Sequence, residues 1–194
     1  EYKIKTLKGM GSNAYRCAHH PPAPELLDAC DRLGMLVMDE NRKLTSAKEG
    51  LEDLESMILR DRNHPCVFIW GMENEEPLEG TPLGARILDT LVRRSHQLDP
   101  TRLTTAAQNH GHVEGGYSDK VDVMGFNYGH NGDKDMKSRA SHPGKAVMAT
   151  ESNATYNTRG IYEDLPRRGY ATAYGTNVWK PPYEWNTGFF IPWQ

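Results

Sequence analysis

Short apolar runs along the chain alternate with segments whose apolar residues recur every three or four positions. The runs are rich in β-branched and aromatic side chains and predict buried strands, whereas the periodic segments predict helices. Seven strands are expected, near residues 13–17, 35–39, 66–71, 102–106, 121–127, 145–150 and 187–192. Strands that alternate with helices predict a parallel sheet.

Turn and cap residues delimit the expected helices. Pro24 lies in the first turn of one helix, which Gly34 ends. Ser46 and Glu49 form a capping-box pattern before a second helix. Thr81 and Pro82 can start a third, which stops at residues 99–100. The polar segment 129–143 is expected to be a loop, and so is much of 153–185, with one short helix near 162–170.

The element order favours an incomplete (β/α)₈ TIM barrel over a doubly wound sheet. No Gly-rich phosphate loop follows the first predicted strand, which argues against a nucleotide-binding sheet. A complete barrel typically needs about 250 residues. Residues 1–194 are therefore interpreted as one partial barrel domain with strands two to eight. Unpaired edge strands would then invite association, so a homo-oligomer or a missing flanking segment remains open.

Polar side chains gather where the predicted strands end. In α/β folds, ligands bind at the carboxyl ends of parallel strands. Glu75 follows the third strand and Glu151 the sixth, and a closed barrel would bring the two carboxylates face to face. Such a pair suits glycoside hydrolysis, in which one carboxylic acid protonates the leaving oxygen and the other carboxylate attacks or activates water.

Three further strand-end residues fit this chemistry. Arg16, at the end of the first strand, can keep the attacking carboxylate ionised by charge pairing. Tyr128, after the fifth strand, could hydrogen-bond to that carboxylate, and Trp193 offers a flat face for a sugar ring. Glu73 and Glu76 are expected to meet solvent or basic partners.

Composition narrows the function classes. Lys+Arg 23 against Asp+Glu 26 gives a net charge of -3, which points to neither nucleic acid nor a membrane surface as partner. No apolar run reaches the roughly 20 residues of a membrane span, and no signal peptide is visible, so a soluble protein of unknown compartment is expected. The three cysteines have no zinc-motif spacing and are interpreted as mostly buried thiols.

Several motifs resemble the barrel domain of glycoside hydrolase family 2, which includes β-galactosidases, β-glucuronidases and β-mannosidases. The stretch "NAYRCAHHPPAPELLDACDRLGMLVMDEN" is similar to the start of that domain, and "RDRNHPCVFIWGMENEE" to its acid/base signature. "FNY" resembles a tyrosine motif of the sixth barrel strand, and "ATES" the nucleophile strand. The resemblance extends from about Gly11 to Trp193.

The resemblance implies a role for each matching position. Glu75 corresponds to the general acid/base, Glu151 to the nucleophile, and Asn74 to the donor to the sugar 2-hydroxyl. The supporting and sugar-binding positions are Arg16, His19, Asp39, Asn127, Tyr128 and Trp193. The family retains anomeric configuration, so the two carboxyl groups are expected about 5–5.5 Å apart. A β-galactosidase-like enzyme acting on a carbohydrate, without a cofactor, is the leading expectation.

Departures from the family pattern keep other functions open. Gly71-Met72-Glu73 replaces the usual Ser-x-Gly, and "DENRKLTS" lacks the histidine of a family metal site, so no metal is expected there. β-Glucuronidase or β-mannosidase specificity and an inactive carbohydrate-binding remnant are alternatives. A metal-dependent hydrolase built on His19, His20 and Asp39 is a third hypothesis.

Overall fold

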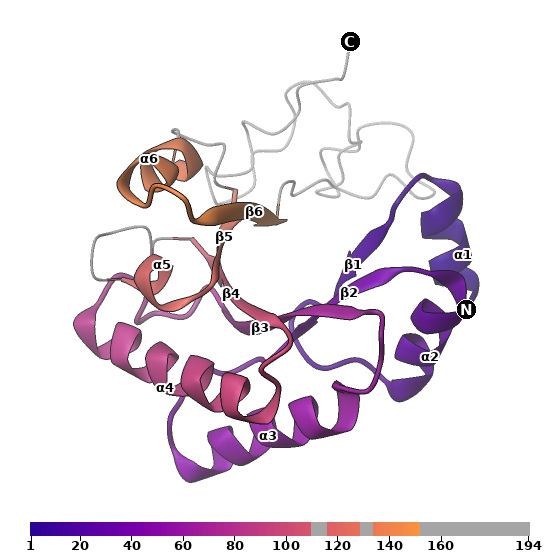
Figure 1. Cartoon of the computed structure of the whole chain (residues 1–194), viewed down its shortest axis with the longest axis horizontal. Coiled ribbons are helices and arrows are strands. Elements are labelled where there is room, and N and C mark those ends of the chain that lie inside the picture. Colours follow the sequence, from indigo (N-terminus) through magenta and orange to yellow (C-terminus); the bar gives the residue numbers. More distant parts are fainter. Residues whose placement is uncertain (110–115, 129–133, 152–194) are drawn as a thin grey trace, which may run out of the picture. The chain divides into compact units, whose positions relative to one another are not determined.

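Six parallel strands form a curved sheet in the computed structural model of the chain, which describes residues 1–109, 116–128 and 134–151 (Figure 1). The strands follow one another in sequence order across the sheet. They are β1 (Ala14–Arg16), β2 (Leu36–Glu40), β3 (Val67–Asn74), β4 (Leu103–Gln108), β5 (Val123–Asn127) and β6 (Ala146–Glu151). Every neighbouring pair is parallel, so the described residues form an open half-barrel, an incomplete TIM barrel as predicted.

Helices cover the outer face of the sheet, and all but the first connect consecutive strands (Figure 1). They are α1 (Tyr2–Gly9), α2 (Pro24–Leu33), α3 (Lys48–Asp61), α4 (Pro82–Leu98), α5 (Tyr117–Lys120) and α6 (Lys134–Ser141). Because parallel strands can be joined only by crossovers, this alternation places all strand carboxyl ends at one edge.

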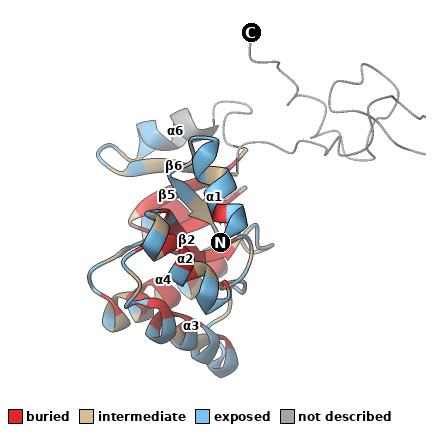
Figure 2. Ribbon diagram, turned by 90° about the vertical axis from the view of Figure 1, so that its right-hand side faces the viewer, coloured by how far each residue is buried: buried red, intermediate tan, exposed pale blue. Residues whose placement is uncertain are grey.

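The main core lies between the helices and the outer face of the sheet, and buried residues concentrate there (Figure 2). Leu27 of α2, Leu54 of α3 and Leu88 of α4 contribute to it, each fully buried. On the inner face, Met38, Ile69 and Val123 form a smaller cluster. Val37 packs in the outer core and Met38 in the inner one, so alternate residues of β2 face opposite sides of the sheet.

Most predicted elements in the described part are confirmed. Gly34 ends α2 in a left-handed conformation with φ of 69°, and the Thr81 hydroxyl caps α4 by accepting from the Gly84 amide at 3.0 Å. The strand predicted near 187–192 and the helix near 162–170 lie outside the described residues. The assignment of 1–194 to one domain stays a prediction for the same reason.

Two local predictions differ from the structure, and one helix was not predicted. The capping box at Ser46 is wrong, because the cap of α3 is Ala47, whose side chain has no acceptor atom. Helix α6 lies inside the segment predicted as a loop; its charged sequence has no apolar stripe to signal a helix. Helix α1 also went unpredicted, since Ile4 is its one buried residue.

The chain turns sharply after two strands that end at the same edge. Glu75, after β3, has φ of 46°, and Tyr128, after β5, has φ of 54°. The pairing register shifts just before each, between Gly71 and Asn74 and between Phe126 and Asn127. These irregularities re-aim the side chains at the strand ends. Among the described helices, none has the length and apolar character needed to cross a membrane.

Candidate active site

The guanidinium of Arg16 links the end of its own strand to the ends of three other strands at this edge. Arg16 ends β1, and its Nε and Nη2 donate to the two carboxylate oxygens of Glu40 at 2.7 and 2.9 Å. Its Nη1 donates to Glu151 Oε1 at 2.7 Å, and Nη2 also donates to Asn74 Oδ1 at 2.7 Å. Burial alone would lower the pKa of Arg16, but the hydrogen bonds and charges of Glu40 and Glu151 raise that pKa above its usual value. The positive charge is therefore fixed beside the Glu151 carboxylate.

The Glu40 carboxylate fixes the position of the Arg16 guanidinium. Glu40 was not among the predicted site residues. Its side chain is fully buried, and the bidentate pair with Arg16 is the strong geometry for these two groups. Gly71 leaves the room for it, since a Cβ at position 71 would lie 3.1 Å from Glu40 Cγ. The pattern in "LVMDE" is apolar on both faces, so the sequence does not reveal which of the two final acids faces inward.

His19 lies between the two carboxylates that bracket Arg16. Its Nδ1 is 3.2 Å from both Arg16 Nη2 and Glu40 Oε1, and its Nε2 is 3.8 Å from Glu151 Oε1. The side chain is 40% exposed, so its ring borders the open side of the cluster. The structure thus places His19 next to Glu151, as expected.

Asn127 connects the third, fifth and sixth strands. Its Nδ2 donates to Asn74 Oδ1 at 3.1 Å and to Glu75 Oε1 at 2.9 Å. Its own Oδ1 accepts from the Thr150 hydroxyl at 2.6 Å, one residue before Glu151. Because both hydrogens and the carbonyl are used, the orientation of this amide is fixed. The two predicted catalytic carboxylates therefore belong to one hydrogen-bonded cluster.

Tyr128 lies close to both carboxylates. Burial, followed by a hydrogen bond to Glu151 and the charges of Glu151 and Glu75, raises its pKa to about 12. Its backbone amide also donates to the Glu151 carbonyl at 2.7 Å, which ties the end of β5 to the end of β6. The phenol thus stays protonated at ordinary pH and acts as a donor to Glu151.

The structure does not bring Asp39 to this cluster. Its side chain is fully buried on the outer face of β2, against Asp61. Burial, with the hydrogen bond and charge of Asp61, raises the pKa of Asp39 to about 8. Within the described residues, neither Asp39 oxygen has a hydrogen-bond donor. Glu40, the next residue, is the carboxylate at the expected place.

The acids around Glu75 differ in environment. Glu76 pairs with Arg42 at 3.3 Å near solvent, as expected. The expectation for Glu73 is wrong: it is fully buried, and its Oε2 accepts from the Glu76 amide at 3.1 Å. Burial, followed by the charge of Glu79, raises the pKa of Glu73 well above its usual value. Glu73 is thus a buried acid beneath the loop, without a basic partner within the described residues.

Two further predictions concern an aromatic residue for sugar stacking and a metal site. Trp193 lies outside the described residues. The proposed His19, His20 and Asp39 metal site is not assembled, because His20 is exposed with Nδ1 2.9 Å from the Pro21 carbonyl, while Asp39 is buried against Asp61.

Comparison with known proteins finds the same domain. The family model described as "Glycosyl hydrolases family 2, TIM barrel domain" matches residues 1–167. A β-galactosidase of Bacteroides ovatus is 34% identical over 97% of this chain and 26% of its own length. A β-glucuronidase of Felis catus is 33% identical over 62% of this chain and 20% of its own length. The chain therefore spans about a quarter or less of these curated relatives.

Solved structures agree on the fold. A family 2 glycosyl hydrolase from Bacteroides cellulosilyticus superposes with a TM-score of 0.72 and 39% identity, covering 79% of this chain and 22% of that one. A β-glucuronidase of Faecalibacterium prausnitzii gives a TM-score of 0.71 and 28% identity over 80% of this chain and 31% of its own.

Proposed function

Because the chain belongs to glycoside hydrolase family 2, we propose that it carries the catalytic centre of a retaining β-glycosidase. Glu151 is the nucleophile and Glu75 the general acid/base. The observation that carries this proposal is the single cluster in which Arg16 binds Glu151 at 2.7 Å while Asn127 binds Glu75 at 2.9 Å. Two carboxylates in one cluster, each with its own donors, match the division of labour in glycoside hydrolysis.

In the first step, the ionised Glu151 attacks the anomeric carbon of the sugar. Arg16 holds Oε1 of this carboxylate and Tyr128 donates to it, so the nucleophile is oriented before the substrate arrives. Glu75 in its protonated form gives its hydrogen to the glycosidic oxygen as the bond to the anomeric carbon breaks. The products are a glycosyl ester on Glu151 and a free alcohol.

In the second step, the ester is hydrolysed. Glu75, now a carboxylate, removes a proton from a water molecule, and the water oxygen attacks the anomeric carbon. The bond to Glu151 breaks, its carboxylate returns to Arg16, and Glu75 is again protonated. Two displacements at one carbon retain its configuration.

Asn74 is assigned to the sugar 2-hydroxyl. Its Oδ1 already accepts from Arg16 and from Asn127 at 2.7 and 3.1 Å, so its Nδ2 is the group left to donate to substrate. Hydrogen bonds to the 2-hydroxyl strengthen in the transition state of such reactions. Glu40 replaces Asp39 in this scheme, as the residue that orients Arg16.

The sugar is proposed to be a β-galactoside, because the β-galactosidase of Bacteroides ovatus aligns with 97% of this chain. β-Glucuronidases are also among the relatives, so β-glucuronide specificity is the runner-up. Nitrophenyl β-galactoside, β-glucuronide and β-mannoside, compared by kcat/KM, distinguish these. A preference for another sugar removes the galactosidase label and leaves the carboxylate roles intact.

The carboxylate roles are tested by Glu151→Gln, with Glu52→Gln as the surface control. Loss of the nucleophile is expected to lower kcat by on the order of 10³-fold or more, since the covalent route disappears. The control removes an exposed glutamate that pairs with Lys48 at 3.8 Å and should leave kcat unchanged. Undiminished hydrolysis by Glu151→Gln overturns the assignment.

A rescue experiment separates the two carboxylates. Azide added to Glu151→Gly should restore aryl-glycoside cleavage and give a glycosyl azide of inverted configuration, because azide attacks where Glu151 would. The same treatment of Glu75→Gly should give the retained product, formed from the glycosyl ester. Exchange of these two outcomes would reverse the roles.

A carbohydrate-binding module made from an incomplete barrel is the second candidate, favoured by the open half-barrel that the described strands form. A site of this kind would hold sugar without turning it over. Calorimetry that detects sugar binding by the wild-type chain, in samples that release no nitrophenol, would favour the module over the enzyme. Native mass spectrometry of the same samples tests whether the chain self-associates.

A further inference from the structure

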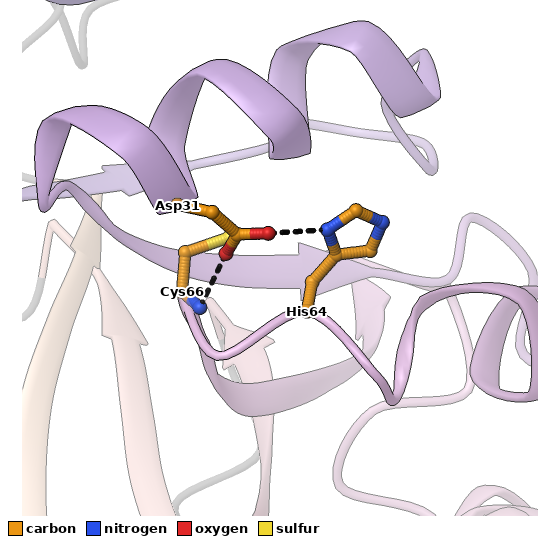
Figure 3. A group of neighbouring side chains, drawn as sticks. All are labelled: Asp31, His64 and Cys66. Atoms are coloured by element: carbon orange, nitrogen blue, oxygen red, sulfur yellow. Dashed lines mark hydrogen bonds and ion pairs between the residues drawn. The ribbon is translucent and has the colours of Figure 1, made fainter.

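A second group of chemically active side chains lies at the opposite end of β3 from the catalytic cluster. Asp31 comes from α2, and His64 and Cys66 from the turn that precedes β3 (Figure 3). Since β3 runs from Val67 to Asn74, the two groups are separated by on the order of 20 Å of extended chain. A ligand bound by these three residues would therefore not contact the catalytic cluster.

Asp31 holds the other two residues in place. Its Oδ2 is 2.6 Å from His64 Nδ1, and its Oδ1 accepts from the Cys66 backbone amide at 2.8 Å (Figure 3). The Cys66 thiol lies 3.6 Å from the Leu27 carbonyl. One potential ligand atom from each of the three side chains lies within 4.8 Å of the others. The carboxylate thus organises an oxygen, a nitrogen and a sulfur around one small volume.

Access to this volume is one-sided. The side chains of His64 and Asp31 are 19% and 22% exposed, whereas Cys66 is 5% exposed. A cation would approach from the side of the partly exposed imidazole and carboxylate and reach the buried thiol last. A tetrahedral ion would need a fourth ligand, which solvent would supply from the exposed side.

We propose that Asp31, His64 and Cys66 form a binding site for a zinc-like divalent transition-metal ion. One sulfur, one nitrogen and one oxygen ligand are a set that zinc accepts in tetrahedral coordination, and the thiolate disfavours Mg²⁺ and Ca²⁺. The site is assembled in space from α2 and the turn before β3, which is why cysteine spacing alone gave no zinc motif.

Binding requires a small rearrangement and the loss of a proton. Ligand atoms about 2.0–2.1 Å from a tetrahedral zinc lie roughly 3.3 Å apart, so the Asp31 oxygen and the His64 nitrogen must separate from their present 2.6 Å. The ion then replaces the hydrogen bond between them. The Cys66 thiol releases its proton to solvent and binds as thiolate, while a neutral imidazole retains one hydrogen, on Nε2.

The bound ion would clamp α2 to the start of β3. Both segments already meet through Asp31, and an ion bonded to all three side chains would strengthen this link without touching the catalytic edge. A ligand that binds only the folded state raises the melting temperature, and the stabilisation grows with the logarithm of the free ligand concentration once that exceeds Kd. The site is therefore expected to stabilise the fold and not to change the sugar chemistry.

Cobalt(II) titration of the 194-residue chain tests the site, because a cobalt–thiolate bond gives a near-ultraviolet charge-transfer band and a tetrahedral ion gives intense visible bands. We expect one Co²⁺ per chain, displaced by Zn²⁺. Cys66→Ser should abolish the thiolate band, and His64→Gln should weaken binding by at least about 10-fold. Cys17→Ser is the matched control, since Cys17 is also 5% exposed and free, and it should retain the band.

A thermal shift gives a second readout that does not depend on the spectrum. Zn²⁺ should raise the melting temperature of the wild type and of Cys17→Ser, but not that of Cys66→Ser, once circular dichroism has verified that all three fold. Absence of a thiolate band in the folded wild type, or its persistence in Cys66→Ser, overturns the proposal. Glycosidase activity is not measured, so this result is independent of the proposed function.

Discussion

Asn127 donates a hydrogen bond to Oε1 of Glu75 at 2.9 Å. The contact crosses from the end of β5 to the residue after β3, with β4 lying between those strands in the sheet order. It links the proposed acid/base to a side chain that is itself anchored by the Thr150 hydroxyl at 2.6 Å. The position of Glu75 thus depends on a residue 52 positions later in the chain.

Asn127→Ala is expected to lower kcat by about 10–100-fold. A hydrogen bond to a charged group is worth about 1.5–3 kcal/mol, and each 1.4 kcal/mol corresponds to about tenfold in rate. Steady-state kinetics on the preferred nitrophenyl glycoside measure the change, with exposed Asn63→Ala as control. A variant that keeps wild-type kcat would show that Glu75 needs no support from Asn127.

Tyr128→Phe is expected to lower kcat by about 10–100-fold with the fold intact, because Glu151 loses a phenolic donor. The pKa of Tyr128 is raised to about 12, so the hydroxyl remains protonated through pH 10. Wild type and variant should therefore share the same alkaline limb in their pH–rate profiles up to pH 10. Tyr2→Phe, at an 82% exposed position, serves as control. A limb that disappears only in Tyr128→Phe would contradict this assignment.

Glu40→Gln is expected to destabilise the fold by about 3 kcal/mol, because it leaves the largely buried Arg16 without its bidentate partner. Glu76→Gln breaks a pair of the same residue types near solvent and should change the free energy of unfolding by only about 0–1 kcal/mol. Urea unfolding of both variants makes the comparison. Equal losses would mean that burial of the Glu40 pair adds nothing to stability.

Asp39→Asn is expected to change how stability depends on pH. The pKa of Asp39 is raised from 3.8 to about 8 by burial and by Asp61, so between these values the folded chain keeps a proton that the unfolded chain has released. Wild-type stability therefore falls as pH rises through this window, by at most about 1.4 kcal/mol per pH unit from this group. Asp39→Asn cannot ionise at this position, so its stability does not show this decrease with pH.

The measurement for Asp39 is urea unfolding between pH 5 and 8. The stability of Asp39→Asn relative to wild type should increase steadily toward pH 8. Exposed Asp28→Asn should instead run parallel to the wild type. Parallel curves for Asp39→Asn would mean that Asp39 is already ionised in the folded protein.

The sequence predicts which strand ends carry chemistry better than it predicts which side chains point there. Glu75 and Glu151 follow apolar runs and Arg16 ends a short predicted strand, so their common edge follows from parallel strand order. Asp39 and Glu40 are adjacent acids on a strand buried on both faces, and only the observed register places Glu40 inward. Binary patterning carries no signal where both faces are apolar.

The burial of Glu73 escaped prediction for a different reason. Three acids within four positions read as a solvated loop, yet β3 runs on to Asn74, so Glu73 lies in a buried strand and only Glu76 reaches Arg42. The pairing register also shifts between Gly71 and Asn74. Such irregularities depend on neighbouring strands that are distant in sequence. Periodicity within one segment cannot reveal them.

The positive φ angles at Glu75 and Tyr128 restrict which amino acids these positions tolerate, whatever their chemistry. Left-handed backbone costs an ordinary residue roughly 1–2 kcal/mol and glycine almost nothing. A glycine at either position would delete the functional group while relieving the turn, whereas valine or isoleucine would add branching to a strained backbone. Site-saturation libraries at 75 and 128 should therefore sort by backbone tolerance, with glycine and asparagine variants among the most heat-resistant and the least active.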